Sequence, residues 1–221
     1  MSLHIEAVVN TLNRNPVEFL PKGELFISRG FLNRYFCEDE GKYTRQLERA
    51  AQCLDLSLIG VWLDTEWSGP LLSEKRYTDL QQYFTVGCIS GPISRLIEKH
   101  GFFDAMLSTR NEAFLFSEIT TGLLKDIEKR AKLARANGFS AMGIADDIAA
   151  NKGLLFSYDY FRDTVFPVYK QISTIIKGND LFAFFHSDGD TRKIMNPLIE
   201  AGYDCFHPID SAAELNLYEL K

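Results

Sequence analysis

The chain has 221 residues, of which 46% are hydrophobic and 24% are charged, so it can form one large α/β domain or two small ones with an ordinary soluble core. Its formal net charge of −6 argues against broad binding to nucleic acids or anionic membranes, because both require a basic surface. No apolar run approaches the about 20 residues that cross a bilayer, and the four cysteines form no CxxC pair, so we expect a cytoplasmic protein with reduced thiols.

The first half of the chain alternates between helical and strand-like apolar patterns. A stripe formed by Ile5, Val8 and Leu12 predicts an opening helix. Pro92 suits the first turn of a later helix. After the opening helix, the pattern predicts a strand at 24–28, helices at 31–36 and 42–53, strands at 56–63 and 83–89, and the helix that begins with Pro92, at 92–100.

The second half continues the same alternation. It predicts a long helix over 116–134, a strand at 139–145, a helix at 161–172, a strand at 181–185, a helix at 194–199, a strand at 203–207 and a tail helix at 212–221. Helices between nearly continuous apolar strands imply parallel pairing with right-handed crossovers.

Both a doubly wound sheet and a barrel satisfy this pattern. No G-x-G-x-x-G or Walker sequence follows any predicted strand, which disfavours the nucleotide-binding forms of the doubly wound sheet. Ionisable residues end several strands, as in the active sites of (β/α) barrels. We therefore predict one TIM-type barrel domain over residues 1–221.

The strand ends supply the catalytic candidates, which are Asp64, Asp146, Asp147, His186 and His207. His186 and Asp188 fit either a metal-binding pair or an acid–base pair, although Ser187-Asp188-Gly189-Asp190 also suits a turn and a helix cap. Because Asp146 and Asp147 are adjacent, their side chains diverge, so one is expected to enter the site while the other caps or pairs outside it.

Four segments together resemble the uroporphyrinogen decarboxylase superfamily. They read GIADDIA at 143–149, FR…FPVYK within 161–170, FHSDGD at 185–190 and GYDCFHPID at 202–210, and the match runs from about residue 23 to the end. The resemblance implies a TIM-type barrel whose site lies at the carboxyl ends of the strands. It also implies one of two activities: decarboxylation of a porphyrinogen-type carboxylate without a cofactor, or zinc-dependent methyl transfer from a corrinoid.

The resemblance also suggests roles for individual residues. Arg29 and Arg34 lie in the region where the decarboxylases carry an arginine pair for substrate carboxylates, but at a different spacing. His186-x-Asp188 stands where the methyltransferases carry a His-x-Cys zinc pair. Three carboxylates at or near strand ends, Glu24, Asp188 and Asp210, are the other substrate-binding candidates.

The sequence stops where the superfamily would begin a seventh strand, so about six of eight βα units are expected. Open edge strands invite pairing, and we expect either a homo-oligomer or a second chain that supplies the missing strands. The cofactor is expected to be zinc or none, and the partner a small-molecule substrate rather than nucleic acid or membrane. A non-catalytic shortened barrel that acts as a binding module is the remaining alternative.

Overall fold

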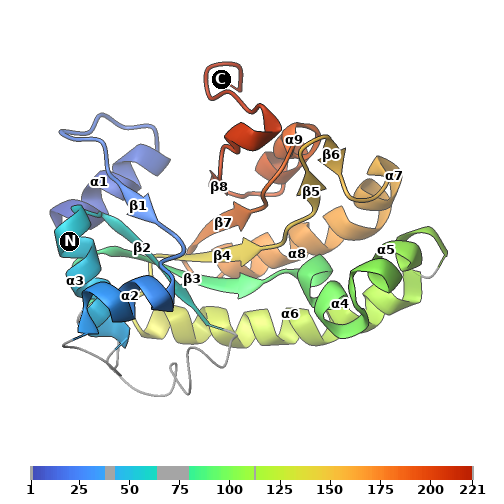
Figure 1. Ribbon diagram of the computed structural model, residues 1–221, viewed down its shortest axis with the longest axis horizontal. Coiled ribbons are helices and arrows are strands. Elements are labelled where there is room, and N and C mark those ends of the chain that lie inside the picture. The colour runs from blue at the N-terminus through green and yellow to red at the C-terminus, as the bar shows by residue number, and fades with distance from the viewer. Residues whose placement is uncertain (1, 38–42, 64–79, 112, 221) are drawn as a thin grey trace. The chain divides into compact units, whose positions relative to one another are not determined.

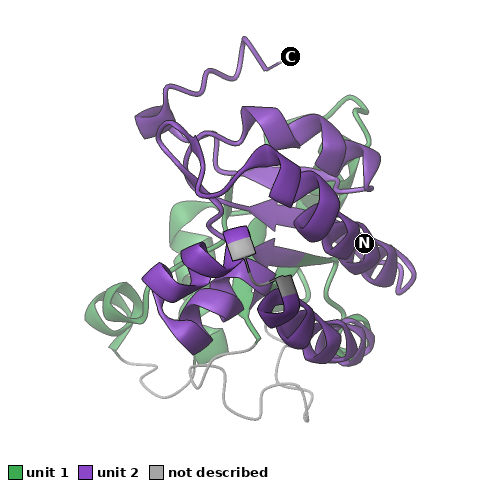
Figure 2. Ribbon diagram, turned by 90° about the vertical axis from the view of Figure 1, so that its right-hand side faces the viewer, with its two compact units in different colours: residues 1–88, 133–142 green, residues 89–132, 143–221 purple. Residues whose placement is uncertain are grey.

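A computed structural model of the chain (Figure 1) describes residues 2–37, 43–63, 80–111 and 113–220. The chain divides into two compact units (Figure 2). Unit 1 comprises residues 1–88 and 133–142, and unit 2 comprises residues 89–132 and 143–221. The single-domain organisation over 1–221 stays a prediction.

Unit 1 begins with a helix and a short strand, and its elements are α1 (Leu3–Leu12), β1 (Gly23–Glu24), α2 (Arg29–Tyr35), α3 (Tyr43–Leu54), β2 (Leu58–Trp62) and most of β3 (Phe84–Ser90). The three strands pair in parallel, with Gly23 opposite Leu58 and Leu58 opposite Phe84. Strand β1 ends at Glu24, before the predicted end at residue 28. Ser28 caps α2 instead, since its hydroxyl accepts the Phe31 N–H.

Unit 2 carries the second half of the fold, and its elements are α4 (Pro92–His100), α5 (Phe102–Asn111), most of α6 (Ala113–Ala136), most of β4 (Ala141–Ala145), β5 (Ala149–Ala150), β6 (Gly153–Leu154), α7 (Tyr158–Tyr160), α8 (Phe166–Lys177), β7 (Phe182–His186), α9 (Arg192–Glu200) and β8 (Cys205–His207). One π-helical turn, Phe161–Val165, joins α7 to α8.

Helix α5 and the β5–β6 hairpin were not predicted. The tail helix expected at 212–221 is wrong, because Ser211–Ala213 is a single 3₁₀ turn and Glu214 ends it with a φ of 57°.

Six of these strands form one sheet in the order β1-β2-β3-β4-β7-β8. Strands β3 and β4 run in the same direction, since the Ser140 N–H donates to Thr85 O at their start and the Gly91 N–H donates to Ala145 O at their end. Parallel strands in sequential order with helical crossovers are the topology of a TIM-type barrel. The predicted fold class, an incomplete (β/α) barrel with six strands, is therefore confirmed.

Aromatic packing fixes the end of the sheet that belongs to unit 2. The Phe185 ring of β7 meets the rings of Tyr169 and Tyr203 edge-on, at centroid distances of 5.2 and 5.6 Å. All three side chains are buried, and the Tyr203 hydroxyl donates to the Tyr169 carbonyl oxygen at 3.2 Å. This packing holds α8 against β7 and so supports the carboxyl ends of β7 and β8. Among the described residues, no helix has the length and apolar character needed to cross a bilayer.

The four thiols are expected to differ sharply in reactivity. Cys37 and Cys53 are exposed, whereas Cys88 is buried and burial beside Asp204 raises the pKa of Cys205 to about 12. Because the thiolate is the reactive form, iodoacetamide at mildly alkaline pH should modify Cys37 and Cys53 and spare the other two. Mass spectrometry of the native protein checks this, with denatured protein as the control in which all four react. Rapid labelling of Cys205 in the native state would contradict the packing of β8.

Candidate functional site

The side chains of Asp147, His186 and His207 come together at the carboxyl ends of β4, β7 and β8, all within unit 2. The Asp146 N–H donates to His186 O at 2.9 Å, which joins the ends of β4 and β7, and His186 lies opposite His207 in the β7–β8 register. His186 Nε2 lies 3.4 Å from Asp147 Oδ1, and His186 Nδ1 lies 2.8 Å from His207 Nδ1. Convergence of this kind is what parallel strand ends provide in a barrel.

The loop after β7 places Asp188 beside this group. The Asp188 N–H donates to Asp147 Oδ1 at 3.2 Å, and the buried Ser187 hydroxyl accepts the Ile148 N–H at 3.1 Å. The Ser187 N–H in turn donates to His207 O at 3.1 Å. The loop is therefore fastened to both neighbouring strand ends, and its backbone orients the Asp147 carboxylate.

Gly189 and Asp210 complete the support of the loop. Gly189 has a φ of +85°, and an added Cβ there would lie 2.7 Å from the carbonyl carbon of Ala149, so only glycine fits. Asp210 Oδ2 accepts the Gly189 N–H at 2.9 Å, and Oδ1 accepts the Ala212 N–H at 2.8 Å. These backbone donors hold the pKa of Asp210 below its usual range. In this structure the Asp210 carboxylate stabilises the loop after β7 through its hydrogen bond with Gly189.

Asp146 points away from its neighbour, as adjacent residues at a strand end do. Its side chain is fully buried, and its carboxylate accepts the N–H groups of Ile93 at 3.1 Å and Ser94 at 2.5 Å, and the Tyr169 hydroxyl at 2.6 Å. It thus caps α4, whose own N-cap residue is Gly91 and offers no side chain. Burial raises the pKa of Asp146 to about 6, although its hydrogen bonds to Tyr169, Ser94 and Ile93 act in the opposite direction.

Burial also shifts the pKa values of the two imidazoles, those of His186 and His207. It lowers the pKa of His186, an effect that the charges of Asp147 and Asp188 oppose. Burial and the neighbouring His186 lower the pKa of His207 to about 4. Both rings are therefore neutral near pH 7, and one must donate to the other through the Nδ1 atoms. Neutral imidazole is the form that binds metal ions.

The ligand atoms of Asp147, His186 and Asp188 all lie within 4.8 Å of one another. Two atoms bound to one tetrahedral zinc ion at the usual bond lengths lie about 3.3 Å apart, close to the 3.4 Å between His186 Nε2 and Asp147 Oδ1. One imidazole and two carboxylates are an accepted donor set for a divalent cation. The residues present therefore fit a metal ion, with His207 behind the imidazole ligand.

The other predicted site residues lie elsewhere or outside the described residues. Glu24 is exposed in β1, and Arg29 and Arg34 lie on α2, all in unit 1. The guanidinium of Arg29 lies 4.7 Å from the ring centroid of Tyr43, and that of Arg34 lies 5.7 Å from the ring centroid of Tyr35. Asp64 falls outside the described residues. The roles assigned to these residues stay predictions.

Sequence reasoning missed two relationships in unit 2. It paired His186 with Asp188 as metal ligands but did not add Asp147, although a carboxylate ending the neighbouring strand is a usable signal. It also missed Tyr169 as the partner of Asp146, because Tyr169 belongs to an apolar helical stripe that reads as ordinary core.

The comparisons with known proteins bear on the fold. No family model matches the sequence, and no curated protein sequence is similar to it. The structure is similar to that of a methyltransferase from Methanosarcina mazei, with a TM-score of 0.67 at 13% sequence identity. The similarity covers 93% of this chain and 76% of the methyltransferase. At this identity it shows a shared fold.

Proposed function

We propose that this protein is a metal-dependent methyltransferase that holds one divalent cation, such as zinc, with Asp147, His186 and Asp188. The observation that carries the proposal is the approach of these three ligand atoms to within 4.8 Å at the carboxyl ends of neighbouring strands. Methyl transfer, rather than another metal-dependent reaction, is supported by the likeness in fold to the Methanosarcina methyltransferase and by the sequence resemblance described above.

Each residue has a defined part in this proposal. His186 binds through Nε2, so its Nδ1 carries the proton and donates to His207 Nδ1 at 2.8 Å. His207 thereby fixes the tautomer and the ring orientation of the ligand, as second partners of metal-bound histidines commonly do. The Asp188 N–H holds Asp147 Oδ1 at 3.2 Å, so one ligand's backbone positions the other's side chain.

Three protein ligands leave a fourth position free on a tetrahedral ion, which is the pattern of catalytic rather than structural zinc sites. A bound cation there would lower the pKa of an acceptor thiol, whose proton would pass to solvent. The thiolate would form a C–S bond to the methyl group of a methylated corrinoid while the Co–C bond breaks, and the corrinoid would leave as Co(I) with the electron pair. The two carboxylates are harder ligands than the cysteine of the resembling methyltransferases, so manganese and iron are also suitable occupants.

Zinc binding tests this proposal. The wild-type protein should bind about one equivalent of zinc in equilibrium dialysis, and His186→Ala should weaken binding at least about 100-fold because a ligand is lost. His207→Phe should weaken it about 10-fold or more by releasing the imidazole. His100→Ala removes a histidine outside the cluster and should leave the affinity unchanged.

Activity gives a second measurement. With zinc bound, the protein should consume methylcobalamin in the presence of a small thiol, and His186→Ala should not. If neither zinc, manganese nor iron binds to the wild-type protein, the proposal is wrong. Cofactor-independent decarboxylation, in which an acidic residue at the strand ends stabilises a protonated pyrrole, would then be the reaction to test.

A further inference from the structure

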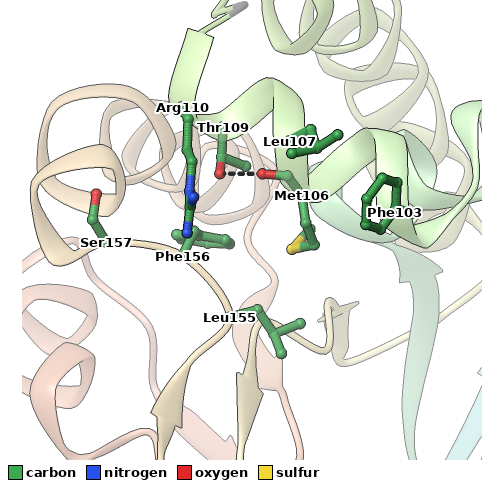
Figure 3. Close-up of a pocket in the computed structure, with 8 residues that line it drawn as sticks. All are labelled: Phe103, Met106, Leu107, Thr109, Arg110, Leu155, Phe156 and Ser157. Carbon is green, nitrogen blue, oxygen red and sulfur yellow. Dashed lines mark hydrogen bonds between the residues drawn. The ribbon is translucent and has the colours of Figure 1, made fainter.

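A cavity of about 650 Å³ lies within unit 2, between α5 and residues 155–157 (Figure 3). None of its lining residues belongs to the Asp147–His186–Asp188 cluster. Its volume lies in the range of sites for small organic ligands. The cavity therefore raises the question of which ligand chemistry its walls match.

The wall of the cavity is largely apolar. Helix α5 contributes Phe103, Met106 and Leu107, and the facing segment contributes Leu155 and Phe156. Phe103 and Leu107 are 73% and 46% exposed, although residues of this type normally avoid water. An exposed apolar wall around a cavity of this size is typical of a binding site.

One polar group in the cavity is unused. The Thr109 hydroxyl donates to Met106 O at 2.7 Å, and the Ser157 hydroxyl accepts the Tyr160 N–H at 3.2 Å. Among the described residues, Arg110 forms no hydrogen bond or ion pair. Figure 3 shows its side chain reaching from α5 towards Phe156. None of the described residues that line the cavity is acidic.

We propose that this cavity binds a small amphipathic monocarboxylate, with its apolar part against the α5 wall and its carboxylate on Arg110. A guanidinium matches a carboxylate through two parallel hydrogen bonds, and such bonds strengthen beside apolar surface. A single cation among the lining residues favours one negative charge over a doubly charged phosphate. The proposal does not depend on the proposed metal site, with which the cavity shares no residue.

Two matched ligands separate the carboxylate contact from apolar contact. Octanoate and octan-1-ol have the same chain, and only octanoate carries a charge. In calorimetric titrations the wild-type protein should bind octanoate about tenfold more tightly than octan-1-ol. Equal affinities, or no saturable binding of octanoate, would overturn the proposal.

Variants locate the two contacts. Arg110→Gln should weaken octanoate binding about tenfold and leave octan-1-ol binding unchanged, whereas Leu107→Asp should weaken both because it disrupts the wall. Arg135→Gln, on the last turn of α6, is the matched control and should bind both ligands as the wild type does. An octanoate affinity that Arg110→Gln leaves unchanged would also overturn the proposal.

Self-association is the competing use of the same surface, and light scattering detects it. If the wild-type protein forms a dimer that Leu107→Asp dissociates, and octanoate does not bind, the α5 wall is an interface between copies and the proposal is wrong. A monomer that binds octanoate, or a dimer whose octanoate affinity falls in Arg110→Gln, supports the carboxylate site.

Discussion

Replacing Asp146 with alanine is expected to lower the free energy of unfolding by about 3 kcal/mol at mildly acidic pH. The substitution removes the cap of α4 and leaves the N–H groups of Ile93 and Ser94 and the Tyr169 hydroxyl without their buried acceptor. Chemical denaturation of the metal-free protein measures the loss. Asp146→Asn keeps an acceptor oxygen and is expected to cost less than about 1 kcal/mol.

The Asp146→Asn variant also has a distinct pH dependence. The folded-state pKa of Asp146, about 6, lies above the usual value of 3.8, so the folded protein holds this proton more tightly than the unfolded chain. The resulting stabilisation is fully present below pH 3.8, falls as the pH rises towards 6 and is lost above it. It corresponds to about 3 kcal/mol.

Asparagine has no such proton, so its stability should not fall over this pH range. The free energy of unfolding of Asp146→Asn, relative to that of the wild type, should therefore rise by about 3 kcal/mol between acidic and neutral pH. Asp180→Asn is the matched control, because Asp180 is exposed and its φ of 55° suits asparagine. Parallel pH profiles for the wild type and Asp146→Asn would show that this carboxyl is not buried as described.

Gly189→Ala is the second substitution with a large expected effect, a loss of about 3 kcal/mol in the free energy of unfolding. Alanine is strained at a φ of +85°, and its methyl group would lie 2.7 Å from Ala149 C and 2.8 Å from Ala149 O. Backbone atoms cannot move aside as a flexible side chain does. The loop between β7 and α9 must therefore shift, and Asp188 shifts with it.

A matched glycine elsewhere makes this result specific. Gly122 lies within α6, and nothing lies within 4 Å of the position that its Cβ would take. Gly122→Ala should stabilise the protein by about 0.5–1 kcal/mol through helix propensity. Gly189→Ala should in addition weaken zinc binding about tenfold or more, since it displaces a ligand, and Gly122→Ala should not. Equal stabilities of the two variants would contradict the described loop geometry.

The sequence allowed the sheet and the ends of its strands to be predicted for a simple reason. A parallel strand buried on both faces is an apolar run, and here it stops at the first ionisable residue. The runs ending at Asp146 and His186 show this pattern, and the structure brings their ends together. Sequential order of the strands followed from the helices between them.

Other parts were not predicted from local pattern. The β5–β6 hairpin has strands of two residues each, too short for any periodicity to appear. Helix α5 was missed although Phe103, Met106 and Leu107 recur at helical spacing in the sequence. Which of Asp146 and Asp147 faces the site depends on contacts with Ser94, 52 positions away in the chain, and with Tyr169.

The contact between Asp146 and the start of α4 links two parts of the chain that are made at different times. Ile93 and Ser94 emerge from the ribosome more than fifty residues before the carboxylate that accepts their amides. Until β4 has joined the sheet, the first turn of α4 lacks this acceptor, and helices of nine residues are unstable alone. The connection between β3 and β4, which contains α4, is therefore expected to become ordered only together with β4, as one cooperative event during folding.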